Sequence, residues 1–275
     1  MPLQISILGC GWLGLAMGSR LKKIGYSIKG STTRKEKIAL LEEKGIVPFL
    51  INLDDERTIS NATKQGFFDC DLLIISVPPR SKTKSSDYHP KQIKHLLSIE
   101  LQSPPKIIYI SATSVYPRAA DIVDEGFPIN ASTTGNKALY EAEQLLLGSG
   151  YPLNILRCGG LMGYDRIPAK YFQGKTVTNG ATPVNYIHRD DVIGIIETLI
   201  AKNTWGETYN LVAPMHPSRR EVFKKNVQDF NFIPPNYSVG SLPDNCRVIL
   251  GEKVIKTLQY QFLFPNPIEF YYTLK

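Results

Sequence analysis

The sequence predicts an α/β fold: a doubly wound parallel sheet with a smaller α/β region toward the C-terminus. Short apolar runs alternate with amphipathic segments through the first half of the chain. The runs are almost continuously apolar, which is typical of parallel strands covered by helices on both faces. A glycine-rich turn with Gly9, Gly11 and Gly14 joins the first run to the first amphipathic segment. Sheets of this kind bind ligands beyond the carboxyl ends of their strands.

The apolar runs of the first half are each short enough for one strand. In chain order, the predicted strands are residues 3–8, 26–32, 46–52, 71–77, 106–111 and 153–158. Segments with apolar residues at helical spacing lie between them. The helices predicted from this spacing cover residues 12–25, 34–44, 93–101 and 132–148.

The pattern loosens beyond about residue 160, where Gly, Pro and Asn become frequent. This part predicts a helix, a strand and two weaker helices, at residues 190–202, 208–212, 217–229 and 249–257. We therefore expect a sheet domain over residues 1–160. Residues 161–275 are expected to form a C-terminal region that borders a substrate cleft and is interleaved with the sheet.

Composition excludes several classes of protein. The chain has 275 residues, of which 43% are hydrophobic and 21% charged, as in a globular domain. No run approaches the ~20 apolar residues of a membrane span, and the N-terminus does not resemble a signal peptide. We therefore expect a cytoplasmic protein with no membrane partner.

The net charge of +7 raises the question of a nucleic-acid partner. Because the basic residues are scattered along the chain, we expect no nucleic-acid partner and consider an anionic, phosphorylated ligand a simpler explanation. The four cysteines form no C-x-x-C pair and the four histidines lie far apart, so no metal site is predicted.

The glycine-rich turn has the G-x-G-x-x-G spacing of a pyrophosphate-binding loop. It directly follows a predicted strand and opens a predicted helix, which is the context that gives this weak motif its meaning. The first two glycines allow the tight turn and the approach of the phosphates, and the third allows close helix packing. The predicted contact residues are Gly9, Cys10, Gly11, Trp12, Leu13 and Gly14. The alternative is a glycine-rich turn without a ligand.

The end of the second strand distinguishes NADP from NAD. An acidic residue there would bind the free ribose hydroxyl of NAD and repel a 2′-phosphate. This chain carries Thr32, Thr33 and Arg34, with no carboxylate before Glu36. Hydroxyls and a guanidinium suit a phosphate, so residues 1–160 are predicted to be a Rossmann domain that binds NADP. Alternatively, Arg34 and Lys35 merely begin a helix.

The chain resembles the extended short-chain dehydrogenases/reductases, the family that includes nucleotide-sugar epimerases and dehydratases. The resemblance rests on the segments GCGWLG, SATSVY, AEQLL, LRCGGLMG, VNYIHRDDV and TYNLV, which begin at residues 9, 111, 142, 156, 184 and 208. The tryptophan of the first segment, STTR after the second strand and YFQGKT at 171–176 resemble the atypical YeeZ-like subgroup more narrowly.

This resemblance implies positions for the cofactor at the ends of the later strands. Asn52 and Leu53 would flank the adenine, and Val77 and Pro78 would line the path to the nicotinamide ribose. Ser111 would lie close to the nicotinamide. A second implied site carries His188 and Asp191, which either border the ligand cleft or tie a loop to the core.

Members of the family that transfer hydride use a Tyr-x-x-x-Lys pair and a Ser or Thr, because the lysine lowers the pKa of the phenol. The predicted helix at 132–148 contains no such pair. If Glu143 is aligned with the family's glutamate, Gly135 and Leu139 stand at the Tyr and Lys positions. Shifting the alignment by two places puts Thr133 and Lys137 there instead.

The Ser/Thr position of the family carries Ala112. Hydroxyl groups surround it, and Thr113 is the candidate that we retain. With Tyr140 and Lys137 from the helix, it forms the predicted substitute catalytic set. Tyr116 is a further tyrosine near this position, which the resemblance marks as structural or substrate-lining.

Two functional hypotheses follow. The first is an NADP-dependent oxidoreductase or nucleotide-sugar epimerase/dehydratase-like enzyme with a non-standard acid/base set. Its small-molecule substrate would be a sugar nucleotide or another anionic compound, met by the arginines Arg157, Arg166, Arg219 and Arg220. The second is a nonenzymatic NADP-binding sensor or interaction protein that has lost the Ser/Tyr/Lys triad. Either could be a monomer or a homodimer.

Overall fold

The structure is a computed structural model that describes residues 2–81, 83–99, 101, 104–118, 121–238 and 246–274. The chain divides into two compact units. The first comprises Met1–Ser111, Asn136–Leu156 and Thr204–Thr208. The second comprises Ala112–Gly135, Arg157–Asn203 and Tyr209–Lys275.

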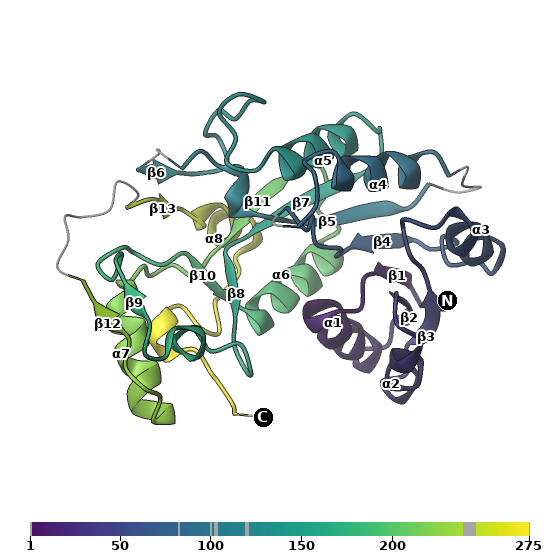
Figure 1. Cartoon of the computed structure of the whole chain (residues 1–275). Helices are drawn as coiled ribbons and strands as arrows, with labels where there is room; N and C mark the ends of the chain where they lie inside the picture. Colours follow the sequence, from purple (N-terminus) through teal and green to yellow (C-terminus); the bar gives the residue numbers. More distant parts are fainter. Residues whose placement is uncertain are drawn as a thin grey trace. The chain divides into compact units, whose positions relative to one another are not determined.

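A seven-stranded sheet confirms the predicted α/β fold class, with the strand order β11-β7-β5-β4-β1-β2-β3 (Figure 1). In chain order, the strands are β1 Gln4–Leu8, β2 Ser27–Thr32, β3 Val47–Leu50, β4 Leu72–Ile75, β5 Lys106–Ala112, β7 Leu153–Cys158 and β11 Thr208–Leu211. Strand β1 pairs in parallel with both β2 and β4. In this register Ile7 lies beside Gly30 on one side and Ile74 on the other.

The helices of the first unit follow the strands in sequence. They are α1 Trp12–Lys23, α2 Ile38–Glu43, α3 Glu56–Lys64, α4 Tyr88–Leu97 and α5 Lys137–Leu147. A short 3₁₀ turn, η1 Lys35–Lys37, precedes α2. Ile7, Met17 and Leu21 are fully buried between α1 and the sheet, and α4 packs against α5 (Figure 1). The ends of β1, β2, β3 and β4 thus meet at one edge, as parallel strands require.

The second unit combines three helices with short paired strands. The helices are α6 Arg189–Lys202, α7 Arg219–Phe230 and α8 Glu252–Leu258. The paired strands are β8 Gly160–Met162 with β10 Tyr186–His188, β9 Thr176–Val177 with β12 Asn236–Tyr237, and β6 Ile122–Val123 with β13 Val248–Ile249. The 3₁₀ turns are η2 Thr113–Val115, η3 Pro168–Phe172 and η4 Pro267–Glu269. No helix within the described part of the chain is long and apolar enough to cross a bilayer.

Three helices differ from the sequence prediction. The helix expected at 132–148 begins only at Lys137, because the Asn136 side chain caps it by accepting the Leu139 N–H at 3.3 Å. The helix expected at 93–101 begins five residues earlier, at Tyr88, and includes Pro90 in its first turn, where proline needs no N–H partner. Helix α3, which starts after the cap Asp55, was not predicted.

Candidate functional site

The glycines of the first loop fit three different requirements. Gly9 has a φ of +105°, and a Cβ there would lie 2.8 Å from the Ser76 carbonyl oxygen. A Cβ on Gly14 would lie 2.3 Å from the Gly9 oxygen. A Cβ on Gly11 would meet no atom within 4 Å. The chain itself therefore excludes side chains at Gly9 and Gly14, whereas at Gly11 a glycine keeps open space beside the backbone.

Strand β2 holds this loop in place. The Cys10 N–H donates to the Ser31 carbonyl at 2.7 Å, and the Gly9 N–H donates to the Ser31 hydroxyl at 2.9 Å. Burial raises the pKa of the Cys10 thiol to about 12, so this cysteine is a neutral packing group. Helix α1 starts directly after the loop with no side-chain cap and no acidic residue in its first turn. Such a helix start attracts an anion.

A cavity of about 170 Å³ extends from the loop along the ends of β2, β3 and β4. Many of the predicted cofactor residues line it: Gly9, Cys10, Gly11, Thr32, Thr33, Arg34, Asn52, Leu53, Val77 and Pro78. Trp12, Leu13 and Gly14 lie in the first turn of α1 and do not line this cavity. Ser111 at the end of β5 is also outside the lining.

The cavity also includes residues that were not predicted, among them Lys37, Arg80, Tyr88 and Gln92. Lys37 lies three residues after Arg34 at the end of η1, so the basic residues clustered at 34–37 were a signal for it. The other three come from the segment before and within α4, which joins the cavity only through the tertiary fold. None of the lining residues that the structure describes is acidic.

The charged side chains of the described cavity lining are Arg34, Lys37 and Arg80, and all three are positive. The Arg34 side chain is 61% exposed and lies 3.9 Å from Glu36, a contact too loose and too exposed to neutralise it. The hydroxyl of Thr32 accepts the Arg34 N–H at 3.2 Å, which fixes the backbone at the end of β2. The rim of the cavity beside β2 is thus basic.

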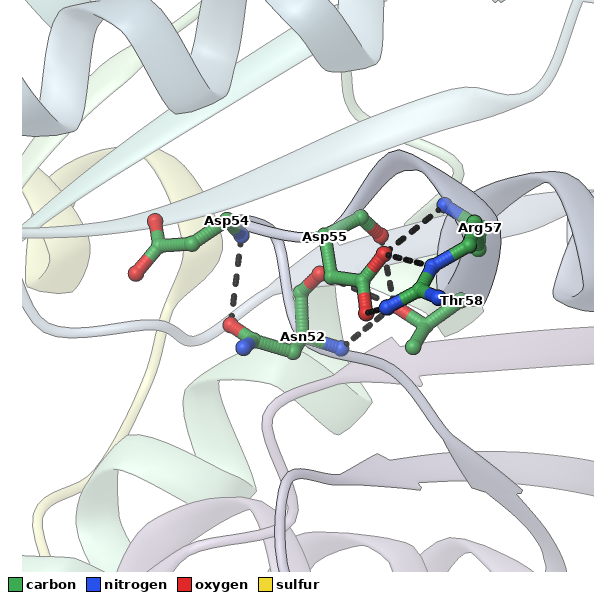
Figure 2. Close-up of polar contacts among 5 residues, drawn as sticks. All are labelled: Asn52, Asp54, Asp55, Arg57 and Thr58. Atoms are coloured by element: carbon green, nitrogen blue, oxygen red, sulfur yellow. Dashed lines mark hydrogen bonds and ion pairs between the residues drawn. The ribbon is translucent and has the colours of Figure 1, made fainter.

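The loop after β3, part of which Figure 2 shows, contributes Asn52 and Leu53 to the lining of the cavity. The Asn52 side-chain oxygen accepts the Asp54 N–H at 3.2 Å, and the Asn52 N–H donates to the Thr58 hydroxyl at 2.9 Å. The Asp55 carboxylate caps α3 by accepting the Arg57 N–H at 3.1 Å. Asn52 is therefore held by a turn that the start of α3 stabilises.

Asp54 connects this loop to α4. Its carboxylate accepts hydrogen bonds from the Tyr88 hydroxyl at 2.8 Å and from the Gln92 amide nitrogen at 3.0 Å. Tyr88 and Gln92 are four residues apart on the same helix face, and both line the cavity. Asp54 thus positions one wall of the cavity without lining it.

The residues around Ser111 form a buried polar group. The Ser111 hydroxyl donates to a Glu143 carboxylate oxygen at 2.6 Å, and both side chains are buried. Nearby, the Tyr109 hydroxyl lies 2.8 Å from His89 Nε2. Burial, together with the charge of Glu143, raises the pKa of Tyr109 well above its usual value. Burial lowers the pKa of His89, so this pair is neutral.

The predicted catalytic residues of α5 lie on one helix face. Lys137 is exposed and its ammonium group lies 3.6 Å from Glu141. Tyr140 is half-buried, one turn from Lys137. Because α5 begins at Lys137, both Thr133 and Gly135 precede the helix.

Gly135 lies in the second unit, where the chain leaves no room for a tyrosine. A Cβ on Gly135 would lie 2.3 Å from the Tyr116 carbonyl oxygen and 2.7 Å from the Ser114 oxygen. The Gly135 N–H donates to the Val115 carbonyl at 3.1 Å. A tyrosine at Gly135, one of the two positions that the sequence alignments place opposite the family's tyrosine, would therefore overlap the backbone.

The second unit also contains Thr113, which is buried in η2. Beside this turn, the Tyr116 hydroxyl donates to the Asn210 side-chain oxygen at 2.8 Å. Arg157 donates to the same hydroxyl at 3.0 Å, and its guanidinium stacks 5.0 Å from the Tyr116 ring centre. Arg157 is buried, so it stabilises Tyr116 in the core.

His188 and Asp191 are also fully buried in the second unit. Asp191 accepts hydrogen bonds from the Tyr260 hydroxyl and from the N–H groups of Leu263 and Phe264, at 3.0, 2.7 and 3.1 Å. His188 Nδ1 accepts the Asp190 N–H, so Nε2 carries the proton that it donates to the Tyr271 carbonyl. These contacts tie the C-terminal segment to α6, as one of the two sequence-based alternatives expected.

Two of the three remaining candidate arginines of the second unit contact an amide or an aromatic group. Arg219 donates to the Asn179 side chain, and Arg220 lies 4.5 Å from the Tyr237 ring centre. Burial lowers the pKa of Arg166. No cluster of His, Cys, Asp and Glu suited to a metal ion occurs among the residues with described positions.

Comparisons with known proteins agree with this architecture. Protein YeeZ of Escherichia coli K12 is 30% identical over 267 residues, which cover 96% of this chain and 97% of that protein. The structure of dTDP-glucose 4,6-dehydratase from Bacillus anthracis in complex with NAD has a TM-score of 0.77 at 16% identity, over 97% of this chain and 94% of that one. UDP-glucose 4-epimerase from Thermotoga maritima, solved with UDP-glucose, has a TM-score of 0.72 at 15% identity, over 94% and 93%. No protein-family model matches the chain.

Proposed function

Because the chain belongs to the YeeZ family of extended short-chain dehydrogenases/reductases, we propose that its first unit binds NADP. We further propose that the protein is an oxidoreductase or an epimerase/dehydratase-like enzyme. Its substrate is a small anionic molecule such as a sugar nucleotide. The structural relatives solved with NAD and with UDP-glucose support a nicotinamide dinucleotide as the cofactor and a sugar nucleotide as the substrate class.

The observation that carries the proposal is the cavity beside the glycine loop. The open space at Gly11 and the uncapped start of α1 suit a pyrophosphate. Leu53 and Asn52 would hold the base, and Val77 and Pro78 would border the path toward the nicotinamide. When bound, the nicotinamide ring supplies the hydride chemistry. The chain supplies binding and orientation.

The preference for NADP rests on the charge of the lining. A 2′-phosphate brings about two negative charges to the end of β2, where Arg34 and Lys37 lie and where the lining has no carboxylate. Arginine and lysine bind phosphate oxygens through charge-assisted hydrogen bonds. NAD would leave these two cations without an anion between them.

For the chemical step, we propose that Tyr140 and Lys137 of α5 replace the family's Tyr-x-x-x-Lys pair. Residues Lys137 and Tyr140 lie one turn apart along α5. A phenol and an ammonium group on neighbouring turns can together exchange a proton with a substrate oxygen. Ser111 serves in orientation, since its hydroxyl is already engaged with Glu143.

A nonenzymatic NADP-binding sensor is the second candidate. It is favoured by the steric exclusion of a tyrosine at Gly135 and by the contact of Lys137 with Glu141. The two candidates differ in one measurement: the enzyme turns over NADPH or converts a substrate, and the sensor does not. Tyr140→Phe should abolish turnover and leave NADPH affinity unchanged if the enzyme is correct.

The cofactor choice is tested by removing two positive charges. The double variant Arg34→Gln/Lys37→Gln should weaken NADPH binding by roughly 10- to 100-fold and leave NADH binding unchanged. Lys22→Gln/Lys23→Gln removes the same charge from the exposed end of α1, outside the cavity, and should change neither affinity. Fluorescence titration measures both. An equal loss for NADPH and NADH in the first variant would contradict the phosphate assignment.

A further inference from the structure

Two arginines in the first turn of α7 oppose the usual electrostatics of a helix. Arg219 and Arg220 directly follow the N-cap Ser218, where the positive end of the helix dipole disfavours cations. The carboxylate of this turn, Glu221, already accepts hydrogen bonds from the Ser218 N–H and hydroxyl, at 2.7 and 2.6 Å. Neither arginine forms an ion pair with a residue that the structure describes. The two positive charges are therefore not balanced by any described carboxylate.

Uncharged groups hold the two guanidinium groups beside one aromatic ring. Arg219 Nη1 donates to the Asn179 side-chain oxygen, and the Arg220 guanidinium lies 4.5 Å from the Tyr237 ring centre. Tyr237 belongs to β12, which pairs with β9 shortly before Asn179 in the chain (Figure 1). Burial raises the pKa of Tyr237, and the charges of Arg220 and Arg219 both oppose this rise. Both cations therefore lie close to the same phenol.

The backbone N–H groups at this helix start are already used, so a ligand would meet the guanidinium groups. The Arg219 N–H donates to the Thr182 carbonyl at 2.9 Å, and the Arg220 N–H donates to the Gly180 carbonyl at 2.8 Å. The capping box uses the next N–H of the turn. The start of α7 thus differs from the start of α1, which has no side-chain cap.

Buried polar atoms beside Arg219 lack a hydrogen-bond partner. Arg219 Nε and Thr182 Oγ1 are buried, and neither has a partner within the described part of the chain. Pro183 and Ser218 form an antiparallel bridge, so Thr182 and Arg219 lie opposite each other with their side chains on the same face. A buried polar atom without a partner is costly. Acceptor oxygens of a ligand at Arg219 would remove this cost.

Two phenols add neutral donors to the cluster. Burial raises the pKa of Tyr186, whereas the charge of Arg219 and a hydrogen bond from it act in the opposite direction. Tyr272 is 8% exposed, and its hydroxyl has no partner among the described residues. Burial and the neighbouring Tyr186 raise the pKa of Tyr272, so its hydroxyl keeps a proton to donate.

We propose that Arg219 and Arg220 form a binding site for the phosphoryl group of a small ligand, a phosphate ester or a diphosphate. Two guanidinium groups match the charge of a phosphoryl group, which is about −2 near neutral pH. Their planar forks donate to its oxygens in pairs, and the phenol hydroxyls are further donors. The inference goes beyond the proposed function, because a ligand can bind here whether or not the first unit holds a dinucleotide.

Isothermal titration calorimetry with inorganic pyrophosphate tests the site. The wild type should bind pyrophosphate, and Arg219→Gln/Arg220→Gln should weaken this binding by roughly tenfold or more. Lys224→Gln/Lys225→Gln is the matched control, because it removes the same charge about one turn farther along α7, and it should keep the wild-type affinity. Arg220→Gln alone changes an exposed side chain, so it should fold normally and still bind more weakly.

The glycine loop of the first unit also suits a pyrophosphate, so the loss in Arg219→Gln/Arg220→Gln relative to the lysine control measures this site. Equal pyrophosphate affinity in these two double variants would overturn the inference. NADPH titration of the same proteins keeps the proposed function separate, since Arg219→Gln/Arg220→Gln should bind NADPH as the wild type does. A wild type that binds NADPH but no additional pyrophosphate would contradict this inference alone. A wild type that binds pyrophosphate through the arginines but no NADPH would contradict the proposed function alone.

Discussion

At the scale of single residues, Gly11 and Gly14 are expected to have different roles, Gly11 in ligand binding and Gly14 in folding. Gly11 has a φ of −80°, which alanine adopts, and an added Cβ there meets no protein atom within 4 Å. An added Cβ on Gly14 would collide with the Gly9 carbonyl at 2.3 Å. Gly11 therefore leaves space for a ligand, and Gly14 allows helix α1 to pack on the loop.

We expect Gly11→Ala to keep the thermal unfolding midpoint within a few degrees of the wild type and to weaken NADPH binding by tenfold or more. Gly14→Ala should instead destabilise the protein by about 1–3 kcal/mol, because the backbone must shift to relieve the overlap. Differential scanning fluorimetry and NADPH titration measure both effects. Unchanged affinity in Gly11→Ala would mean that no phosphate approaches this residue.

Gly135 provides a second test at this scale. Its backbone lies against the Tyr116 and Ser114 carbonyl oxygens. Gly135→Ala should therefore lower the free energy of unfolding by about 1–3 kcal/mol in urea titrations. Gly148→Ala is the control, because a Cβ there comes no closer than 3.4 Å to another atom. Equal stability of the two variants would show that the loop adapts easily and that steric exclusion does not explain the missing tyrosine.

Residues that follow strands could be predicted from the sequence, because a parallel sheet brings them to one edge. Gly9, Thr32, Asn52 and Val77 all line the cavity in this way. Tyr88 and Gln92 could not be predicted, since they reach the cavity through hydrogen bonds of Asp54 that join segments 34 or more residues apart. Such long-range contacts leave no periodic signal in the sequence.

At the scale of elements, the long strands were predictable and the helix ends were not. The burial of β1, β4 and β7 matches their apolar sequences. Helix α5 starts late because Asn136 caps it, and α3 was missed because Ile59 and Ala62 are its only apolar residues. Strands β6 and β13 are two residues long and pair Ile122 with Val248, so neither segment indicates its partner.

Replacing Asp191 tests how α6 retains the segment at residues 260–264. Its buried carboxylate accepts three hydrogen bonds from the segment at residues 260–264. Asp191→Ala should leave those donors unpaired and lower the free energy of unfolding by about 3 kcal/mol. Limited proteolysis should then cleave the variant within this segment. Wild-type resistance to protease would show that packing alone retains it.

At the scale of the whole molecule, buried histidines make stability depend on pH. Burial lowers the pKa of His89 and of His188, whereas both have a pKa of about 6.5 in the unfolded chain. Below that pH the unfolded state binds more protons, so the free energy of unfolding should fall as the pH falls. Each group contributes at most about 1.4 kcal/mol per pH unit.

Urea titrations at pH 7.5 and 5.5 measure this dependence. His89→Phe should be less stable at pH 7.5, because the Tyr109 hydroxyl loses its partner, but its stability should change less with pH than that of the wild type. Burial raises the pKa of Asp191 and of Glu125, which acts in the opposite direction at lower pH. An unchanged pH dependence in His89→Phe would show that this histidine titrates alike in both states.

The central claim is that the first unit holds NADP between the glycine loop and the basic end of β2. A crystal structure of the protein grown with NADPH tests it most directly. We expect the pyrophosphate at Gly11 and the start of α1, with the 2′-phosphate within hydrogen-bond distance of Arg34 or Lys37. An empty cavity at saturating NADPH, or a 2′-phosphate directed into solvent away from both cations, would contradict the account.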